Sequence, residues 1–163
     1  SWSRRAWVTL PAGFDGAVDT NGRVLPVQHH GDQVLAEVII PSCGWTTLHK
    51  GEGQVLPSTL IVTDRILENE LLRVVFNERG EISSLVDKQA SQAELAAGLC
   101  NSFAMYKDVP TRFDAWDIDS MYEKLPVTLD ALATFEVVAA GPLVGTIRIS
   151  RQLHNSWMTQ EVS

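Results

Sequence analysis

The sequence lacks the motifs by which most catalytic centres are recognised. It contains no G-x-S-x-G elbow, no phosphate-binding P-loop and no dinucleotide fingerprint. Its two cysteines, Cys43 and Cys100, lie far apart, in no C-x-x-C pattern and in no recognisable nucleophile motif with a histidine. We expect two reduced, buried thiols, with a disulfide as the alternative. The residues themselves therefore assign no catalytic role.

Positive charge and long apolar runs are also scarce. The chain of 163 residues carries 13 Lys and Arg against 20 Asp and Glu, a formal net charge of -7. Such a chain repels phosphate backbones, which argues against nucleic acid as a partner. Without a bilayer-length apolar run or a signal peptide, we expect no membrane partner and a cytoplasmic location. Ser1 to Arg5 do not form a plausible initiator sequence, so we expect the true start upstream.

What is present is a succession of short β-type runs separated by turn residues. Residues 6–10 and 33–41 are strand candidates, and Asn21-Gly22 between apolar segments predicts a hairpin turn. We expect a small antiparallel β domain over residues 1–50. Residues 51–59, rich in Gly, Pro and Ser, are expected to form a linker.

Residues 60–163 are expected to form the first part of a larger β-sandwich domain. A hairpin and three further strands are predicted over residues 70–76 with 82–86, and over 134–140, 143–153 and 157–162. Gly80 should supply a positive φ in the hairpin turn, and Gly141-Pro142 should turn between strands. Only residues 91–99 look helical. The fold class is therefore all-β, with antiparallel sandwich units and at most one short helix.

The segment from Asn101 to Tyr122 holds the densest chemistry. Aspartates alternate there with aromatic rings, in a connection longer than the roughly 12–15 residues usual for structureless loops. Such a mixture suits sugars, because hydroxyls need acceptors while the apolar sugar face stacks on a ring. The candidates for a substrate rim are Arg112, Asp114, Trp116, Asp117 and Asp119. The alternative is structural: the aspartates cap turns, and Trp116 anchors the loop on the sandwich.

Two further hypotheses on these residues are weaker. Asp114, Asp117 and Asp119 have oxygen ligands for calcium, but the spacing and the Gly of an EF-hand loop are missing. Asp117 and Asp119 would share one face of an extended strand, as paired hydrolytic carboxylates do, but the sequence supplies no positioned acceptor site for such a pair. The adjacent His29-His30 would point to opposite faces of a strand, which does not suit zinc. We expect no metal site in this chain.

The chain resembles the C-terminal part of α-mannosidases of glycoside hydrolase family 38, especially the bacterial and cytosolic type. The most specific match is the run Asp-Ala-Trp-Asp-Ile-Asp at residues 114–119, preceded by Asp108-Val-Pro. Other matching features are Leu67-Glu-Asn-Glu70, Val74-Val-Phe76, the run at residues 80–88, Asn101, Ser156 and Gln160. Residues 2–48 resemble the small β domain ahead of that part, through Trp2, Arg4, Leu10-Pro11, Gly22, Leu25-Pro26, Gln28 and Gly44-Trp45-Thr46-Thr47-Leu48.

The resemblance implies a parent enzyme that cleaves α-mannosides in glycans by a retaining, zinc-assisted mechanism. In that family the zinc ligands and the nucleophile belong to an N-terminal α/β barrel, which has no counterpart here. It also implies a galactose-mutarotase-like sandwich, of which only the opening strands are present. We thus expect an inactive fragment without a cofactor of its own, whose partners are mannose-containing glycans and other domains of the parent. An oligomer is compatible with the sequence. The alternatives are an autonomous carbohydrate-binding module and a structural subunit-interface domain.

Overall fold

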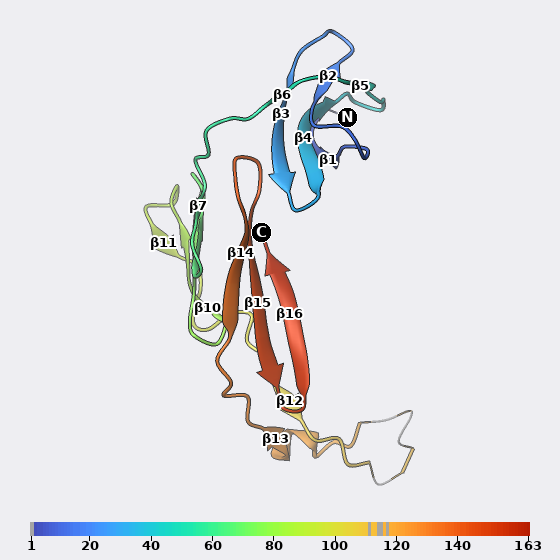
Figure 1. Ribbon diagram of the computed structural model, residues 1–163. Coiled ribbons are helices and arrows are strands. Elements are labelled where there is room, and N and C mark those ends of the chain that lie inside the picture. The colour runs from blue at the N-terminus through green and yellow to red at the C-terminus, as the bar shows by residue number, and fades with distance from the viewer. Residues whose placement is uncertain (1, 111, 114–115, 117) are drawn as a thin grey trace.

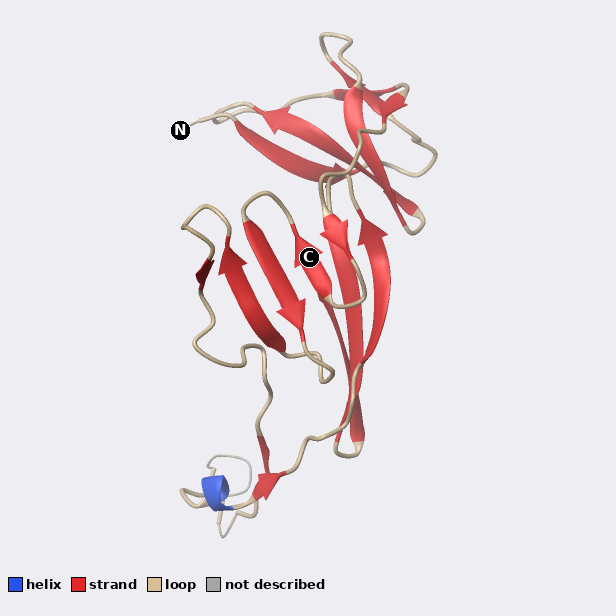
Figure 2. Cartoon of the chain, turned by 90° about the vertical axis from the view of Figure 1, so that its left-hand side faces the viewer, coloured by secondary structure: helices blue, strands red, loops and turns tan. Residues whose placement is uncertain are grey.

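The structure, a computed structural model, describes residues 2–110, 112, 113, 116 and 118–163. Within these residues the regular structure is β-strand apart from one 3₁₀ turn, η1 (Tyr122–Lys124). Most strand pairs are antiparallel, and the expected all-β fold class is confirmed (Figure 2). In this described part of the chain, no helix has the length and apolar character needed to cross a membrane.

The first 54 residues form a small sheet with the order β1-β4-β3-β6, and a separate strand pair β2-β5. The strands are β1 (Arg4–Thr9), β2 (Ala17–Asp19), β3 (Leu25–His30), β4 (Gln33–Ile40), β5 (Leu48–Lys50) and β6 (Gly53–Gln54). Alternate residues of β4, namely Val34, Ala36 and Val38, are buried in one apolar cluster. This period of two is the expected pattern of a half-buried strand.

The hairpin turn predicted at Asn21-Gly22 is confirmed. The Asp19 carboxylate accepts hydrogen bonds from the backbone N–H groups of Asn21 and Arg23, at 2.8 and 3.0 Å. Gly22 has a φ of +79°, a backbone conformation that residues with a Cβ rarely adopt. The turn therefore has both its side-chain cap and its glycine.

The remainder forms a sandwich of two sheets (Figures 1 and 2). One has the order β11-β10-β9-β8-β7, and the other β14-β15-β16. Their strands are β7 (Ile61–Val62), β8 (Ile66–Glu68), β9 (Leu72–Phe76), β10 (Ile82–Asp87), β11 (Ala93–Glu94), β14 (Thr134–Ala140), β15 (Gly145–Leu153) and β16 (Ser156–Val162). Phe76, Ile147 and Ile149 are the buried centre of the core between them. The predicted hairpin and the three later strands are confirmed.

Gly80 shows why the turn between β9 and β10 needs glycine. Its φ is +78°, and a Cβ at this position would lie 2.5 Å from Cγ2 of Ile149. The turn thus packs directly on the centre of the sandwich core, where an added methyl group has no room.

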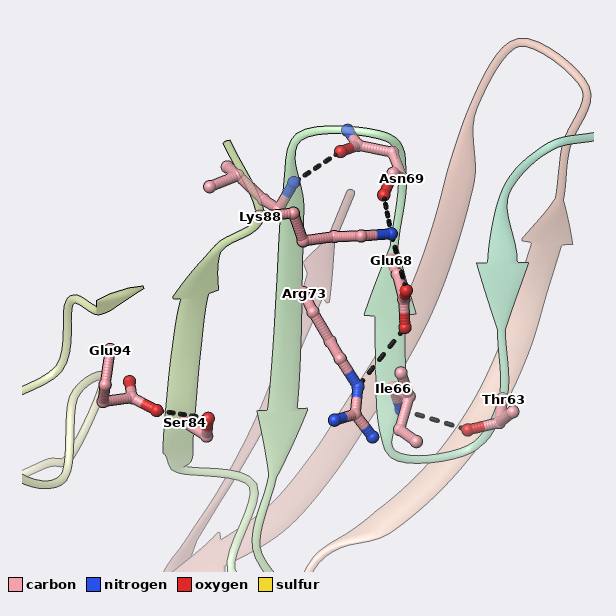
Figure 3. Close-up of polar contacts among 9 residues, drawn as sticks. Thr63, Ile66, Glu68, Asn69, Arg73, Ser84, Lys88 and Glu94 are labelled. Atoms are coloured by element: carbon pink, nitrogen blue, oxygen red, sulfur yellow. Dashed lines mark hydrogen bonds and ion pairs between the residues drawn. The ribbon is translucent and has the colours of Figure 1, made fainter. Parts of the chain in front are cut away.

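The helix predicted over residues 91–99 is wrong. Ser91 and Gln92 have φ angles of +56° and +61°, and β11 pairs with β10 instead. The Glu94 carboxylate accepts hydrogen bonds from the Ser84 hydroxyl and the Leu85 N–H, and the Ser84 contact appears in Figure 3. These bonds, the Ser84 bond first, lower the pKa of Glu94. Specific pairing with a formed strand thus outweighs a helix propensity that is worth little over two turns.

Glu68 on β8 links neighbouring strands, with one oxygen 2.7 Å from Lys88 Nζ and the other 3.3 Å from Arg73 Nε (Figure 3).

The two cysteines, Cys43 and Cys100, are free, as expected. Both are exposed, so the expectation of buried thiols is wrong.

The two parts of the chain are joined by a buried glutamine. Gln28 on β3 is 3% exposed and meets the turn between β14 and β15. Its Oε1 accepts from the N–H groups of Leu143 and Val144 at 2.7 and 2.8 Å, and its Nε2 donates to the Val144 carbonyl at 2.8 Å. The side-chain amide therefore pairs with the turn as a neighbouring strand would. The division into domains at residues 50 and 60 stays a prediction.

We expect Gln28→Met to weaken this junction. Methionine has a similar length but leaves the two turn N–H groups without an acceptor, at roughly 1–3 kcal/mol for each stranded group. The urea midpoint of the chain should fall, and amide exchange in residues 51–59 should accelerate.

Gln152→Met is the matched control, because Gln152 is exposed and its side chain, among the described residues, binds just the nearby carbonyl of His154. Its effect should stay within about 0.5 kcal/mol, as for most surface substitutions. Equal midpoints for Gln28→Met and the unaltered chain would contradict the role of this amide.

Candidate functional site

Arg112, Trp116 and Asp119 lie on an arm that projects from one end of the sandwich (Figures 1 and 2). We define the arm as residues 105–127. Its stem is the antiparallel pair of β12 (Met105–Tyr106) and β13 (Pro126–Val127). The N–H of Lys107 extends the stem by donating to the carbonyl of Leu125 at 2.9 Å. The long connection predicted between the sandwich strands is therefore held at its base by only a short ladder.

Local contacts order the segment next to the stem. The rings of Tyr106 and Tyr122 meet edge to face, with centroids 5.3 Å apart and planes at 87°. Asp119 Oδ1 accepts from the N–H of Met121 at 2.9 Å, and the Asp119 carbonyl accepts from the N–H of Tyr122 at 3.0 Å. Asp119 thus closes the turn that leads into η1, where aspartate is favoured because its side chain satisfies a free N–H; the N-cap of η1 itself is Met121, without a side-chain cap bond. The expected structural role of an arm aspartate as a turn cap is seen here.

The apolar side chains of the arm face solvent. Trp116 is 89% exposed and Phe113 is 71% exposed. The N–H of Trp116 donates to the Phe113 carbonyl at 2.9 Å, and Phe113 has a φ of +60°. The alternative in which Trp116 anchors the loop on the sandwich is therefore wrong.

The structure places three of the five rim candidates. Arg112 and Trp116 are exposed and Asp119 is half-buried, and all three belong to the arm. Asp114 and Asp117 lie outside the described residues. The proposed pairing of Asp117 with Asp119, and the calcium hypothesis, therefore stay predictions.

The histidines do not gather either. His29 and His30 end β3, while His154 lies in the turn between β15 and β16 with a φ of +52°. Over the described ranges, no cluster of three or more His, Cys, Asp or Glu side chains has the geometry to hold a metal ion.

The comparisons with known proteins now decide the family. A family model described as the C-terminal domain of glycosyl hydrolases family 38 matches residues 67–163, from β8 through the arm to β16. The chain belongs to glycoside hydrolase family 38. This membership confirms the resemblance drawn from the sequence.

Two curated relatives agree with this assignment. The chain is 31% identical over 143 residues to alpha-mannosidase 2C1 of Homo sapiens, and 32% identical over 143 residues to alpha-mannosidase 2C1 of Mus musculus. Each match covers 81% of this chain but 14% of the relative. The chain therefore spans a small part of the length of these family members.

The hydrogen bond from the Met121 N–H to Asp119 can be tested by substitution. Asp119→Ala removes the acceptor for the Met121 N–H, so the amides of residues 121–125 should exchange several-fold faster, while global stability falls by no more than about 1 kcal/mol. Hydrogen exchange followed by mass spectrometry measures both.

The control is Asp108→Ala, on the same arm. Asp108 is exposed and has no hydrogen-bond partner among the described residues, so its removal should leave the exchange of residues 121–125 unchanged. If both variants altered exchange equally, the cap at Asp119 would not be what orders η1.

Proposed function

We propose that this chain is a non-catalytic β part of an α-mannosidase that hydrolyses α-mannosides in glycans. The supporting observation is its membership of family 38, together with its coverage of 14% of the alpha-mannosidases it matches. The described residues offer no ligand set for zinc, so we assign the zinc and the hydrolytic step to other parts of the parent enzyme.

Within the parent enzyme, we assign the arm to the rim of the mannoside site. Trp116 presents an indole face to solvent, and a sugar ring can stack on it through its C–H face. Oδ1 of Asp119 accepts the hydrogen bond from the Met121 N–H. Its other carboxylate oxygen has no partner among the described residues, so it can accept a hydrogen bond from a sugar hydroxyl. Arg112, exposed on the same arm, adds guanidinium donors. Rim groups of this kind bind and orient a substrate, while the bond is broken elsewhere.

One observation favours a second candidate, an autonomous carbohydrate-binding module. Trp116 is the most exposed of the five tryptophans, at 89%, and needs no other domain to offer a stacking platform. In that case the chain alone should bind a mannose oligosaccharide, with a saturable change in tryptophan fluorescence that Trp116→Ala removes. The rim function predicts no measurable binding by the chain alone.

The rim function is tested in the parent enzyme. We expect Trp116→Ala, and the double change Asp117→Ala with Asp119→Ala, to lower kcat/KM for an α-mannoside about tenfold or more. Tenfold corresponds to about 1.4 kcal/mol of transition-state stabilisation, which is within reach of one stacking or hydrogen-bond contact. Thermal stability should change little for Trp116→Ala, because the Trp116 side chain is 89% exposed.

Trp157→Ala is the matched control, since Trp157 is 73% exposed on β16 and is remote from the arm in sequence. It should leave kcat/KM unchanged. If the arm variants left both turnover and stability at the level of the unaltered parent, the rim function would be wrong. The cytoplasmic location and the oligomeric state stay predictions.

A further inference from the structure

The arm joins the sandwich through two limbs (Figures 1 and 2). The outgoing limb, residues 100–104, leads to β12, and the return limb, residues 128–133, leads from β13 to β14. The outgoing limb is fixed where it starts, because Cys100 and Ile82 exchange two backbone hydrogen bonds, at 3.0 and 2.9 Å. The direction in which the arm projects therefore depends on how the return limb is held.

Two hydrogen bonds hold the return limb on the sandwich. The N–H of Ala133, at the end of the limb, donates to the carbonyl of Glu78 at 2.9 Å. The carbonyl of Leu129, just past β13, accepts from Nη2 of Arg151 at 3.5 Å. The second contact lies closer to the stem of the arm, and its donor comes from β15, in the interior of the sandwich.

Both contacts converge on the turn between β9 and β10. Glu78 belongs to this turn, and Nη1 of Arg151 donates to the turn carbonyl of Arg79 at 2.7 Å. The turn itself is fixed, because Asn77 Oδ1 accepts from the N–H groups of Arg79 and Glu81 at 2.9 and 3.1 Å. The buried Glu81 carboxylate accepts in turn from Asn77 Nδ2 at 2.8 Å. One guanidinium thus connects the return limb to a rigid base.

Stability alone does not account for an arginine at this position. Arg151 is 1% exposed, its Nε has no acceptor, and it forms no ion pair in the described part of the chain. By contrast, Arg148 on the same strand pairs with Glu136 and Glu161 at 2.7 and 2.8 Å. A buried charge without a partner is costly, and an apolar side chain of similar volume is often more stabilising.

We infer that Arg151 is a positioning residue for the arm. From inside the sandwich it fixes the return limb against the turn between β9 and β10, and thereby the place at which Trp116 and Asp119 lie. The inference rests on the proposed function in that it takes the arm as part of the mannoside rim. Since the stem of the arm is a pair of two-residue strands, the limbs set the position of everything beyond it. A small displacement of binding groups is enough to lower turnover.

The first test measures the arm directly in this chain. Nitroxide labels are introduced by Met121→Cys on the arm and Trp157→Cys on β16, both exposed positions, with Cys43→Ser and Cys100→Ser to remove the other thiols. Arg151→Met removes both donors and keeps the length of the side chain. We expect the distribution of distances between the labels to become about twofold wider or more, while amide exchange within β15 and β16 is not accelerated.

Arg151→Lys is the milder variant, which keeps the charge and a donor for the Arg79 carbonyl but loses the planar fork that reaches Leu129 as well. It should widen the distribution in the same way with a smaller effect, and it tests the inference even if Arg151→Met does not fold. Arg148→Met is the matched control and should leave the distribution unchanged. Unchanged widths for both Arg151 variants would overturn the inference. Wider distributions accompanied by faster exchange throughout β15 and β16 would make the role merely structural and would overturn it too.

The second test is a mutant cycle in the parent enzyme. Arg151→Met should lower kcat/KM for an α-mannoside about fivefold or more. In a parent that already carries Trp116→Ala and Asp119→Ala, the same change should cost less than about twofold, because the rim groups that it displaces are gone. Equal losses in the two backgrounds would show that Arg151 does not act through the arm. If Trp116→Ala with Asp119→Ala left turnover unchanged, the proposed function would be wrong, and the label distances would decide by themselves whether Arg151 fixes the arm.

Discussion

The amide of Gln28 connects the two β parts of the molecule, and their arrangement depends on it. It lies on β3, whose other face packs into the first apolar cluster, so both faces of this short strand are covered. The turn that binds Gln28 also contacts Ser58, because Gly141 in this turn packs so closely on Ser58 that a Cβ would not fit. A polar side chain with three short bonds to backbone groups specifies one docking geometry, which an apolar contact would leave free to slide.

The arm is organised on a different principle. The sandwich is specified by long-range pairing and buried apolar faces, whereas the arm relies on a two-residue stem, one aromatic pair and the cap at Asp119. Few contacts of the arm bury surface, so the conformation of the arm contributes little to the folding free energy of the chain.

Much of the fold could be predicted from the sequence, because its signals are local. The alternation in β4, the aspartate and glycine around the turn at Gly22, and the glycine at Gly80 each act through neighbouring residues. The helix over residues 91–99 was wrong for the complementary reason, since Glu94 binds Ser84 and Leu85 on another strand. The Gln28 contact joins residues more than 100 positions apart, and no pattern along the chain announces it. Of the site, composition identified the arm, but it could not give the exposure of Trp116 or the cap at Asp119.

We propose that this family 38 chain is part of an α-mannosidase and does not carry the hydrolytic centre of that enzyme. The most direct measurement is the turnover of a chromogenic α-mannoside by this chain and by the parent enzyme in parallel, with zinc or cobalt supplied to both. The account predicts turnover by the parent and none by the chain. Turnover by the chain itself would contradict the account and would make Asp114, Asp117 and Asp119 the first residues to examine as a catalytic set.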